Sequence, residues 1–282
     1  MFGCRGQLGV ELVPVFAARG YQVIGFERSQ VDISDSAQVE QVFARENPAI
    51  VINAAAYNQV DVAESDPAAA MSANGLAVRN LAMAARQHDA RLVHFSTDYV
   101  FDGTAQRPYT EEDATHPLGA YAVSKLAGEF YARAYLEHPL IIRTCGVFGP
   151  GGLQTPRGNF VETMLRLAGK GQPIRVVDDH VACPTYAPVL AARTADMVDR
   201  GLTGIYHAGG GEAIAWFDYA SMIFRVAGLH PELRRTNERE FRTPARRPKY
   251  SVLSNAKMER CGIEPFPPLA TALKMYMEAR GK

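Results

Sequence analysis

The chain opens on MFGCRGQLGVEL, residues 1–12, in which Gly3, Gly6 and Gly9 lie three residues apart. A GxxGxxG loop lets the backbone turn tightly and approach a pyrophosphate, whose charge then rests on the amides and the positive end of the following helix. Because the chain contains 24 glycines, the same spacing also arises by chance in a simple turn. The loop alone is therefore a weak indication of a dinucleotide site.

The strand that normally precedes such a loop is missing from its place. Only Met1 and Phe2 stand before Gly3, whereas the fold needs a central strand of about five apolar residues there. Without it, two neighbouring strands would leave buried amides and carbonyls unpaired, each at a cost of about 1 to 3 kcal/mol. We therefore expect a short native segment of roughly four to six apolar residues to belong before Met1. The alternative is that another part of the chain supplies the central strand.

Beyond the loop, β-branched runs alternate with alanine-rich stretches up to residue 145, the pattern of a parallel sheet covered by helices on both faces. The strand candidates are 21–26, 49–56, 91–96 and 139–144, and the helix candidates between them are 36–46, 67–87 and 118–135. Later helix candidates, separated by longer irregular pieces, are 159–168, 185–200, 216–227 and 268–279. The pattern predicts an α/β fold with a Rossmann-like doubly wound parallel sheet and a smaller C-terminal substrate-binding region. We expect residues 1–145 to form mainly the dinucleotide-binding core and residues 146–282 mainly the substrate-binding region, with some segments returning to the core.

Charge and cysteine usage limit the class of protein. Thirty Lys and Arg residues balance thirty Asp and Glu residues, which argues against nucleic acid or an anionic membrane as the main partner. The four cysteines form no CxxC pair and the seven histidines show no metal-ligand spacing, so we expect neither a disulfide framework nor a metal site. No apolar run approaches the length of a membrane span and no leader is evident, so we expect a cytoplasmic protein.

Two charged residues follow the first full strand candidate. Glu27 stands where a carboxylate binds an adenosine ribose, and Arg28, directly after it, is suited to a 2′-phosphate. The pair is therefore compatible with both NAD and NADP, although both residues could also be solvated loop charges.

A second motif, YAVSK, places Tyr121 and Lys125 four residues apart on a predicted helix, and therefore on one face. A nearby ammonium favours phenolate, so we expect Lys125 to lower the pKa of Tyr121 towards the range of a proton donor to a substrate oxygen. A surface pair is the alternative. Thr97, just past the end of strand candidate 91–96, is expected to face the same crevice as this helix.

Together these motifs resemble the extended short-chain dehydrogenases/reductases, and within them the dTDP-4-dehydrorhamnose reductase family. The resemblance runs from Gly3 to about Arg280 and includes NAAAYNQVDVAE (53–64), STDYVFDG (96–103), YAVSK (121–125) and RTCGVFGPGG (143–152). It implies a nicotinamide-dependent reduction of the C4 ketone of a 6-deoxy-4-keto sugar nucleotide. It also implies that Thr97, Tyr121 and Lys125 form the catalytic group.

The resemblance further implies the binding residues. The cofactor contacts would be Gly3, Gly6, Gln7, Leu8, Gly9, Glu27, Arg28, Asp32, Ile33, Ala54, Ala55, Ala56, Asn74, Tyr121 and Lys125. The substrate contacts would be Thr97, Asp98, Tyr99, Gly146, Asn159 and Arg247.

The chain departs from the family at two places. Gly146 stands where members often have a tryptophan near the sugar, which leaves the identity of the sugar open. Some members bind magnesium through glutamates at a dimer interface; Glu11 matches one of them, but Pro188 replaces another, so no metal is expected here. A homodimer remains an expectation. The rival interpretations are another NDP-4-ketosugar reductase, an epimerase on the same fold, and a non-catalytic regulatory subunit like the partner of methionine adenosyltransferase.

Overall fold

The computed structural model describes residues 1–155 and 158–281. At its centre is a parallel sheet in the order β1-β2-β3-β6, formed by β1 (Ile50–Asn53), β2 (Arg91–Thr97), β3 (Leu140–Thr144) and β6 (Gly204–His207). All of β3 is buried, and so is all of β2 except Arg91. Strands buried along their whole length are typical of a sheet with helices on both faces. The predicted α/β class is confirmed.

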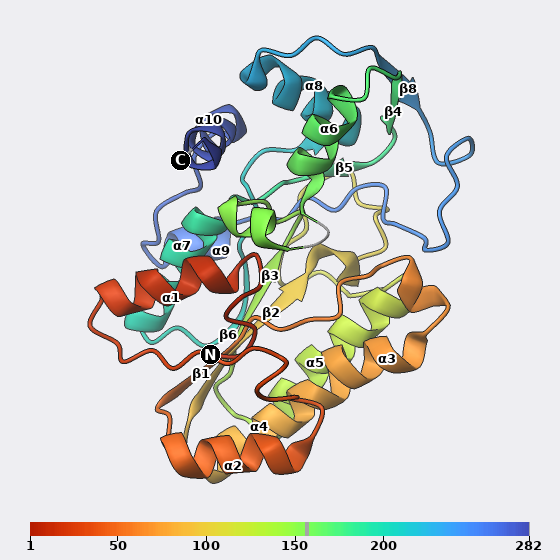
Figure 1. Cartoon of the computed structure of the whole chain (residues 1–282). Coiled ribbons are helices and arrows are strands. Elements are labelled where there is room, and N and C mark those ends of the chain that lie inside the picture. The colour runs from red at the N-terminus through yellow and green to blue at the C-terminus, as the bar shows by residue number, and fades with distance from the viewer. Residues whose placement is uncertain (156–157, 282) are drawn as a thin grey trace.

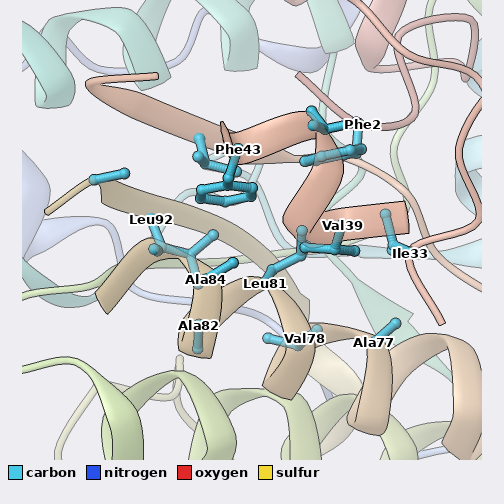
Figure 2. Packing of buried hydrophobic residues seen from close by; sticks show 14 of the residues in the cluster. Phe2, Ile33, Val39, Phe43, Ala77, Val78, Leu81, Ala82, Ala84 and Leu92 are labelled. Carbon is cyan, nitrogen blue, oxygen red and sulfur yellow. The ribbon is translucent and has the colours of Figure 1, made fainter. Parts of the chain in front are cut away.

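Helices cover the two faces of this sheet (Figure 1). On one face, α1 (Gly9–Ala18) packs against α7 (Ala187–Asp199); on the other, α4 (Ala77–Gln87) packs against α2 (Ser36–Glu46) and α5 (Ala120–Tyr135). Figure 2 shows part of the second layer, where Phe43, Leu81 and Leu92 meet in one apolar cluster. Burial of these side chains fixes the helices to the sheet and so aims their N-terminal ends at one edge.

The predicted helix 67–87 is helical throughout but not uniform. It consists of α3 (Pro67–Met71), a π-helical turn η2 (Ser72–Leu76) and α4. Single π turns inside helices are frequent at functional sites. Here the turn carries Asn74, whose amide bonds the backbone of Tyr57 and the hydroxyl of Ser124, and so ties the helix to the segment after β1 and to α5.

The chain after residue 145 forms a second apolar core. The helices around this core lie in the upper part of Figure 1. Around the core lie α6 (Phe160–Ala168), α8 (Trp216–Ala227), α10 (Leu269–Arg280) and the pair of β4 (Ile174–Val177) with β8 (Leu233–Thr236). The remaining elements are η1 (Val62–Glu64), η3 (Asp98–Val100), η4 (Pro150–Gln154), β5 (Val181–Ala182), β7 (Ile214–Ala215) and α9 (Ala256–Arg260). Strand β6, from the same half of the chain, pairs with β3 in the central sheet.

The N-terminus differs from the strand pattern expected for residues 21–26. Phe26 alone makes a parallel bridge, to Phe2, and Phe2 bridges Asn53 on its other side. The ladder continues back to Met1, whose carbonyl accepts from Phe26 and whose amine donates to Ile24 at 2.7 Å. On the N-terminal side of this ladder, residues 21–24 and 46–52 border a cavity of about 340 Å³ instead of a strand. The strand prediction for 21–26 is wrong because a strand needs a paired ladder, and this ladder ends at Met1.

Within residues 1–155 and 158–281, Phe2 is the residue that makes a β-bridge to both Phe26 and Asn53. The expectation of further apolar residues in this place stays a prediction.

Candidate active site

The carboxyl ends of β1, β2 and β3 open into a cavity of about 610 Å³, at the edge where ligands bind in doubly wound sheets. Its walls come from the glycine loop, the segment after β1, the ends of β2 and β3, α5 and Trp216. A second cavity of about 390 Å³ shares Gly3, Glu27, Arg28 and Ala55 with it. The two volumes form one elongated site that begins at Phe26 and ends at the catalytic candidates.

The glycine loop is closed tightly onto its surroundings. Gly3 has φ +78°, and a Cβ on it would lie 2.6 Å from the amide nitrogen of Ala55. A Cβ on Gly9 would lie 2.1 Å from the carbonyl oxygen of Gly3. Since no side chain fits at either position, the backbone itself forms the wall of the cavity at the N-terminus of α1. Such a cradle fits the pyrophosphate of a dinucleotide.

The 390 Å³ cavity has the lining expected for an adenosine. Its walls include Phe26, Glu27, Arg28, Asp32 and Ile33. Asp32 accepts hydrogen bonds from the backbone N–H and hydroxyl of Ser34, so its carboxylate supports the loop. Arg5, which the sequence interpretation missed, lies with its Nε 3.6 Å from the Glu27 carboxylate. Glu27, expected to bind the ribose, thus has Arg5 as an ion-pair partner and Arg28 as its neighbour in the chain.

Thr97, Tyr121 and Lys125 all line the larger cavity. The Thr97 hydroxyl hydrogen-bonds the Tyr121 phenol and also Asp98 Oδ1, at 3.1 Å. Lys125 is 3% exposed, and its ammonium donates to the carbonyl oxygen of Phe95 at 2.6 Å. Thr97 and Tyr121 are 24 positions apart along the chain. Folding brings them together with Lys125 at one cavity.

Burial controls the protonation of this group. It raises the pKa of Tyr121 to about 12, opposed by the Thr97 hydrogen bond, and it lowers the pKa of Lys125 to about 8. The expectation that Lys125 lowers the pKa of Tyr121 is wrong here, because desolvation of the phenolate dominates and the ammonium bonds Phe95 instead. At neutral pH the phenol carries its proton and can give it to a developing alkoxide.

The expected substrate contacts Asp98, Tyr99 and Gly146 also line this cavity. The ring of Tyr99 stands edge-on to that of Tyr121, with centroids 6.0 Å apart. Asp98 is 3% exposed, and burial raises its pKa. At Gly146, φ is +50° and a Cβ would lie 3.7 Å from Cη2 of Trp216. An aromatic side chain thus does approach this position, but it comes from α8; the signal available in the sequence was that Trp216 is the sole tryptophan.

The structure does not place every expected residue at the cavities. Those that line one of the two are Gly3, Gly6, Gln7, Leu8, Glu27, Arg28, Asp32, Ile33, Ala54, Ala55, Ala56, Tyr121 and Lys125 among the cofactor contacts, with Thr97, Asp98, Tyr99 and Gly146 among the substrate contacts. Gly9, Asn74, Asn159 and Arg247 line neither of these two cavities.

Three of these four residues hold other parts of the chain: Asn74, as described above, Asn159 and Arg247. Asn159 caps α6 by accepting from the N–H of Glu162 at 3.0 Å. Arg247 bonds the Asp61 carboxylate at 2.8 Å, so its guanidinium already has an anionic partner. The Asn159 cap is a local contact between residues three positions apart, whereas the Arg247–Asp61 pair joins segments that only folding brings close.

The Glu11 carboxylate accepts from the N–H of Gly151 at 3.2 Å, and burial raises its pKa. In the described part of the chain, no group of three or more potential metal-binding side chains is gathered. None of the helices described there is both long and apolar enough to cross a membrane.

Comparison with known proteins gives a family for this geometry. The family model described as RmlD substrate binding domain matches residues 1–281. A dTDP-4-dehydrorhamnose reductase of Streptomyces griseus is 40% identical over 274 residues, covering 94% of this chain and 88% of that protein. The spore coat polysaccharide biosynthesis protein SpsK of Bacillus subtilis is 36% identical over 278 residues, covering 99% and 96%.

A solved structure agrees with the sequence matches. The dTDP-4-dehydrorhamnose reductase of Bacillus anthracis, in complex with NADP, superposes with a TM-score of 0.93 at 32% identity, covering 98% of this chain and 97% of that one. The glycine loop, the three candidate catalytic residues at one cavity and the nearly full-length similarity all agree with this family. The chain belongs to the RmlD substrate binding domain family, as an NAD(P)-dependent reductase of that family.

Proposed function

We propose that the protein reduces the C4 ketone of dTDP-4-dehydro-6-deoxy-L-mannose (dTDP-4-dehydrorhamnose) to give dTDP-L-rhamnose, with NADPH or NADH as the reductant. The observation that carries the proposal is the convergence of Thr97, Tyr121 and Lys125 on a cavity that continues to the glycine loop. The cofactor supplies the hydride, and the protein supplies alignment and a proton.

Each residue of the trio has a distinct part. Tyr121 gives its phenolic proton to the C4 oxygen as negative charge develops there, which its raised pKa permits at neutral pH. Thr97, already bonded to Tyr121, donates to the same carbonyl oxygen in the complex. Lys125 holds the nicotinamide ribose from the floor of the cavity.

The cofactor would lie with its pyrophosphate on the Gly3–Gly9 loop and its adenosine in the cavity beside Phe26 and Ile33. Glu27 suits the free ribose of NAD, whereas Arg28 and Arg5 suit the 2′-phosphate of NADP. The NADP complex of the Bacillus anthracis relative supports the second arrangement.

A second candidate is reduction of a different NDP-4-keto sugar. Two observations favour it: Gly146 with Trp216 departs from the family pattern at the sugar end of the cavity, and SpsK is as similar in length and identity as the rhamnose enzymes. An epimerase or a non-catalytic regulatory subunit is less well supported, because the proton-donating trio is complete.

The deciding experiment is incubation with NADPH and a panel of NDP-4-keto-6-deoxy sugars, followed by loss of nicotinamide absorbance. Product analysis then establishes the configuration at C4. Turnover of the L-mannose derivative above the others supports the proposal, turnover of another member supports the second candidate, and no turnover with any sugar contradicts a reductase function.

Binding has its own readout. Trp216 is the only tryptophan and lines the cavity, so its fluorescence should be quenched by energy transfer when NADPH binds. We also propose that residues 1–145 mainly bind cofactor and residues 146–282 mainly bind sugar, and that the protein works in the cytoplasm as a homodimer. Light scattering on the purified protein tests the dimer.

A further inference from the structure

A buried carboxylate, Glu129, lies behind the catalytic group and is 1% exposed. Both of its oxygens accept from Arg143, Oε1 from Nε at 2.9 Å and Oε2 from Nη2 at 2.7 Å. The Ser96 hydroxyl donates to Oε1 as well. The three side chains come from α5, β3 and β2, and each is almost completely buried. Every described ion pair elsewhere has a partner that is more exposed than either of these.

Each member of this network lines the cavity or lies close in sequence to a residue that does. Ser96 lines the cavity itself, directly before Thr97, and Arg143 precedes Thr144, which also lines the cavity. Glu129 follows Lys125 by four residues and so lies on the same face of α5. One carboxylate therefore joins the helix that carries Tyr121 and Lys125 to the strand ends that carry Thr97 and Thr144.

The charges around Lys125 give this carboxylate a second consequence. His94 of β2 faces the ammonium, and burial keeps that imidazole neutral by lowering its pKa. Two other buried titratable groups belong to neighbouring elements, Asp98 of η3 and His207 of β6. Burial raises the pKa of Asp98, and burial together with the Arg143 charge lowers the pKa of His207 to about 3. Burial lowers the pKa of Lys125 to about 8, and the charge that opposes this shift is Glu129.

We propose that Glu129 is a positioning residue for the catalytic group, which fixes α5 against β2 and β3 and supplies the negative charge that Lys125 faces. The proposal deepens the proposed reductase function and rests on it for the role of Lys125. It assigns to Glu129 no contact with substrate or cofactor, since Arg143 and Ser96 occupy its oxygens.

The test is Glu129→Gln, which keeps the shape and removes the charge, compared with Ser96→Ala, which removes one hydrogen bond and keeps the charge. The readout is the pH dependence of kcat/KM between pH 6 and 9. In Glu129→Gln the alkaline limb should move down by about one pH unit, so that activity relative to pH 6 falls about fivefold further at pH 8 than in the unmodified protein. In Ser96→Ala the limb should stay in place while kcat falls. An unmoved limb in Glu129→Gln overturns the proposal.

Removing Glu129 alone leaves Arg143 as an unpaired buried charge, which is strongly destabilising. The double variant Glu129→Leu with Arg143→Met avoids this, because apolar replacement of a buried ion pair is often tolerated. The double variant removes the Glu129 charge, which opposes the lowering of the Lys125 pKa. In the double variant, the alkaline decline of kcat/KM should therefore also begin at a lower pH. A decline at the original pH contradicts the proposal.

A readout without sugar separates this inference from the proposed function. NADPH affinity can be followed through Trp216 fluorescence. As the pH is raised, its alkaline decline should begin at a lower pH in Glu129→Gln than in the unmodified protein. If none of the sugars is reduced but this shift is seen, the substrate assignment fails and the role of Glu129 stands. If sugar reduction is seen but neither pH dependence moves, the role of Glu129 fails alone.

Discussion

Glu64 Oε1 accepts a hydrogen bond of 2.8 Å from the backbone N–H of Ala120, the residue before Tyr121. Glu64 ends η1 and Ala120 begins α5, so a carboxylate from a distant segment caps the helix that carries the proton donor. Gly119 makes the approach possible, since a Cβ there would lie 2.6 Å from Glu64 Oε1. An anionic cap at a helix N-terminus is stabilising through both the hydrogen bond and the helix dipole.

Glu64→Ala should lower kcat by about three- to tenfold while changing NADPH affinity less than twofold, because loss of a cap worth about 1 kcal/mol loosens the first turn around Tyr121. The matched control is Asp66→Ala, which removes the side-chain cap of α3, a 3.0 Å bond to the N–H of Ala69. It should lower thermal stability by a similar amount and leave kcat unchanged. Equal loss of kcat in both variants would show that Glu64 has no special relation to Tyr121. Steady-state kinetics and calorimetry on the two variants give these values.

Tyr121→Phe should lower turnover by about two orders of magnitude or more, because it removes the proton donor. NADPH affinity should stay nearly intact, since the phenyl ring still fills its place beside Tyr99. Trp216 fluorescence measures the affinity and nicotinamide absorbance measures the turnover. Unchanged turnover in this variant would be incompatible with the proposed mechanism.

Lys125→Met should damage both turnover and NADPH affinity, because the ammonium is proposed to hold the nicotinamide ribose. In the unmodified protein both quantities should decline above pH 8, since the pKa of Lys125 lies near that value and only the protonated form carries the charge. The variant should lose this alkaline decline in affinity. Retention of full NADPH affinity by Lys125→Met would remove the ribose contact from the proposal.

The protein should use NADH and NADPH with kcat/KM values within about tenfold, that is within about 1.4 kcal/mol, because Glu27 suits a free ribose and Arg28 a phosphate. Arg28→Ala should shift the preference towards NADH. Arg5→Ala should do so as well, and should also free Glu27 from its ion pair. Kinetics with both cofactors test this, and an unaltered NADPH/NADH ratio in Arg28→Ala would show that Arg28 does not reach the 2′-phosphate.

Adding four apolar β-branched residues before Met1 should raise the melting temperature, because the added backbone can pair with residues 21–24 and 50–51 across the 340 Å³ cavity. If each of several new hydrogen bonds contributes about 1 kcal/mol, the rise should be at least about 4 °C. Four Gly and Ser residues in the same place are the control, and a rise no larger than theirs would contradict the prediction.

The same extension has a pH signature. Burial lowers the pKa of the Met1 amine from 8.0 to about 6. Between these values the unfolded chain binds more protons than the folded one, so this group makes stability rise with pH from about 6 to 8. Extension moves the amine out of the cavity and removes this dependence. The gain in melting temperature should accordingly be larger at pH 6 than at pH 8.

Much of the fold was predictable from local patterns. The apolar runs at 91–96 and 139–144 lie within or beside β2 and β3, and helix 36–46 has the predicted bounds because Asp35 provides an N-cap that is evident in the sequence. The prediction of a strand at 21–26 was wrong because a β-strand needs a hydrogen-bonded partner strand, and the sequence of the segment itself does not show whether that partner is present.

The candidate site likewise has a part that was predicted from the sequence and a part that only the tertiary structure decided. The sequence predicted the glycine loop and the group of Thr97, Tyr121 and Lys125 from motifs and from the position of Thr97 at a strand end. The structure brings Gly3, Gly6 and these three residues to one cavity, and their roles stay predictions. The pKa of Tyr121, the pairing of Arg247 with Asp61, the approach of Trp216 to Gly146 and the Glu129–Arg143 pair were decided by the tertiary structure. Each depends on burial or on contact between residues far apart in the chain, and the dielectric and neighbours of a side chain exist only once the chain has folded.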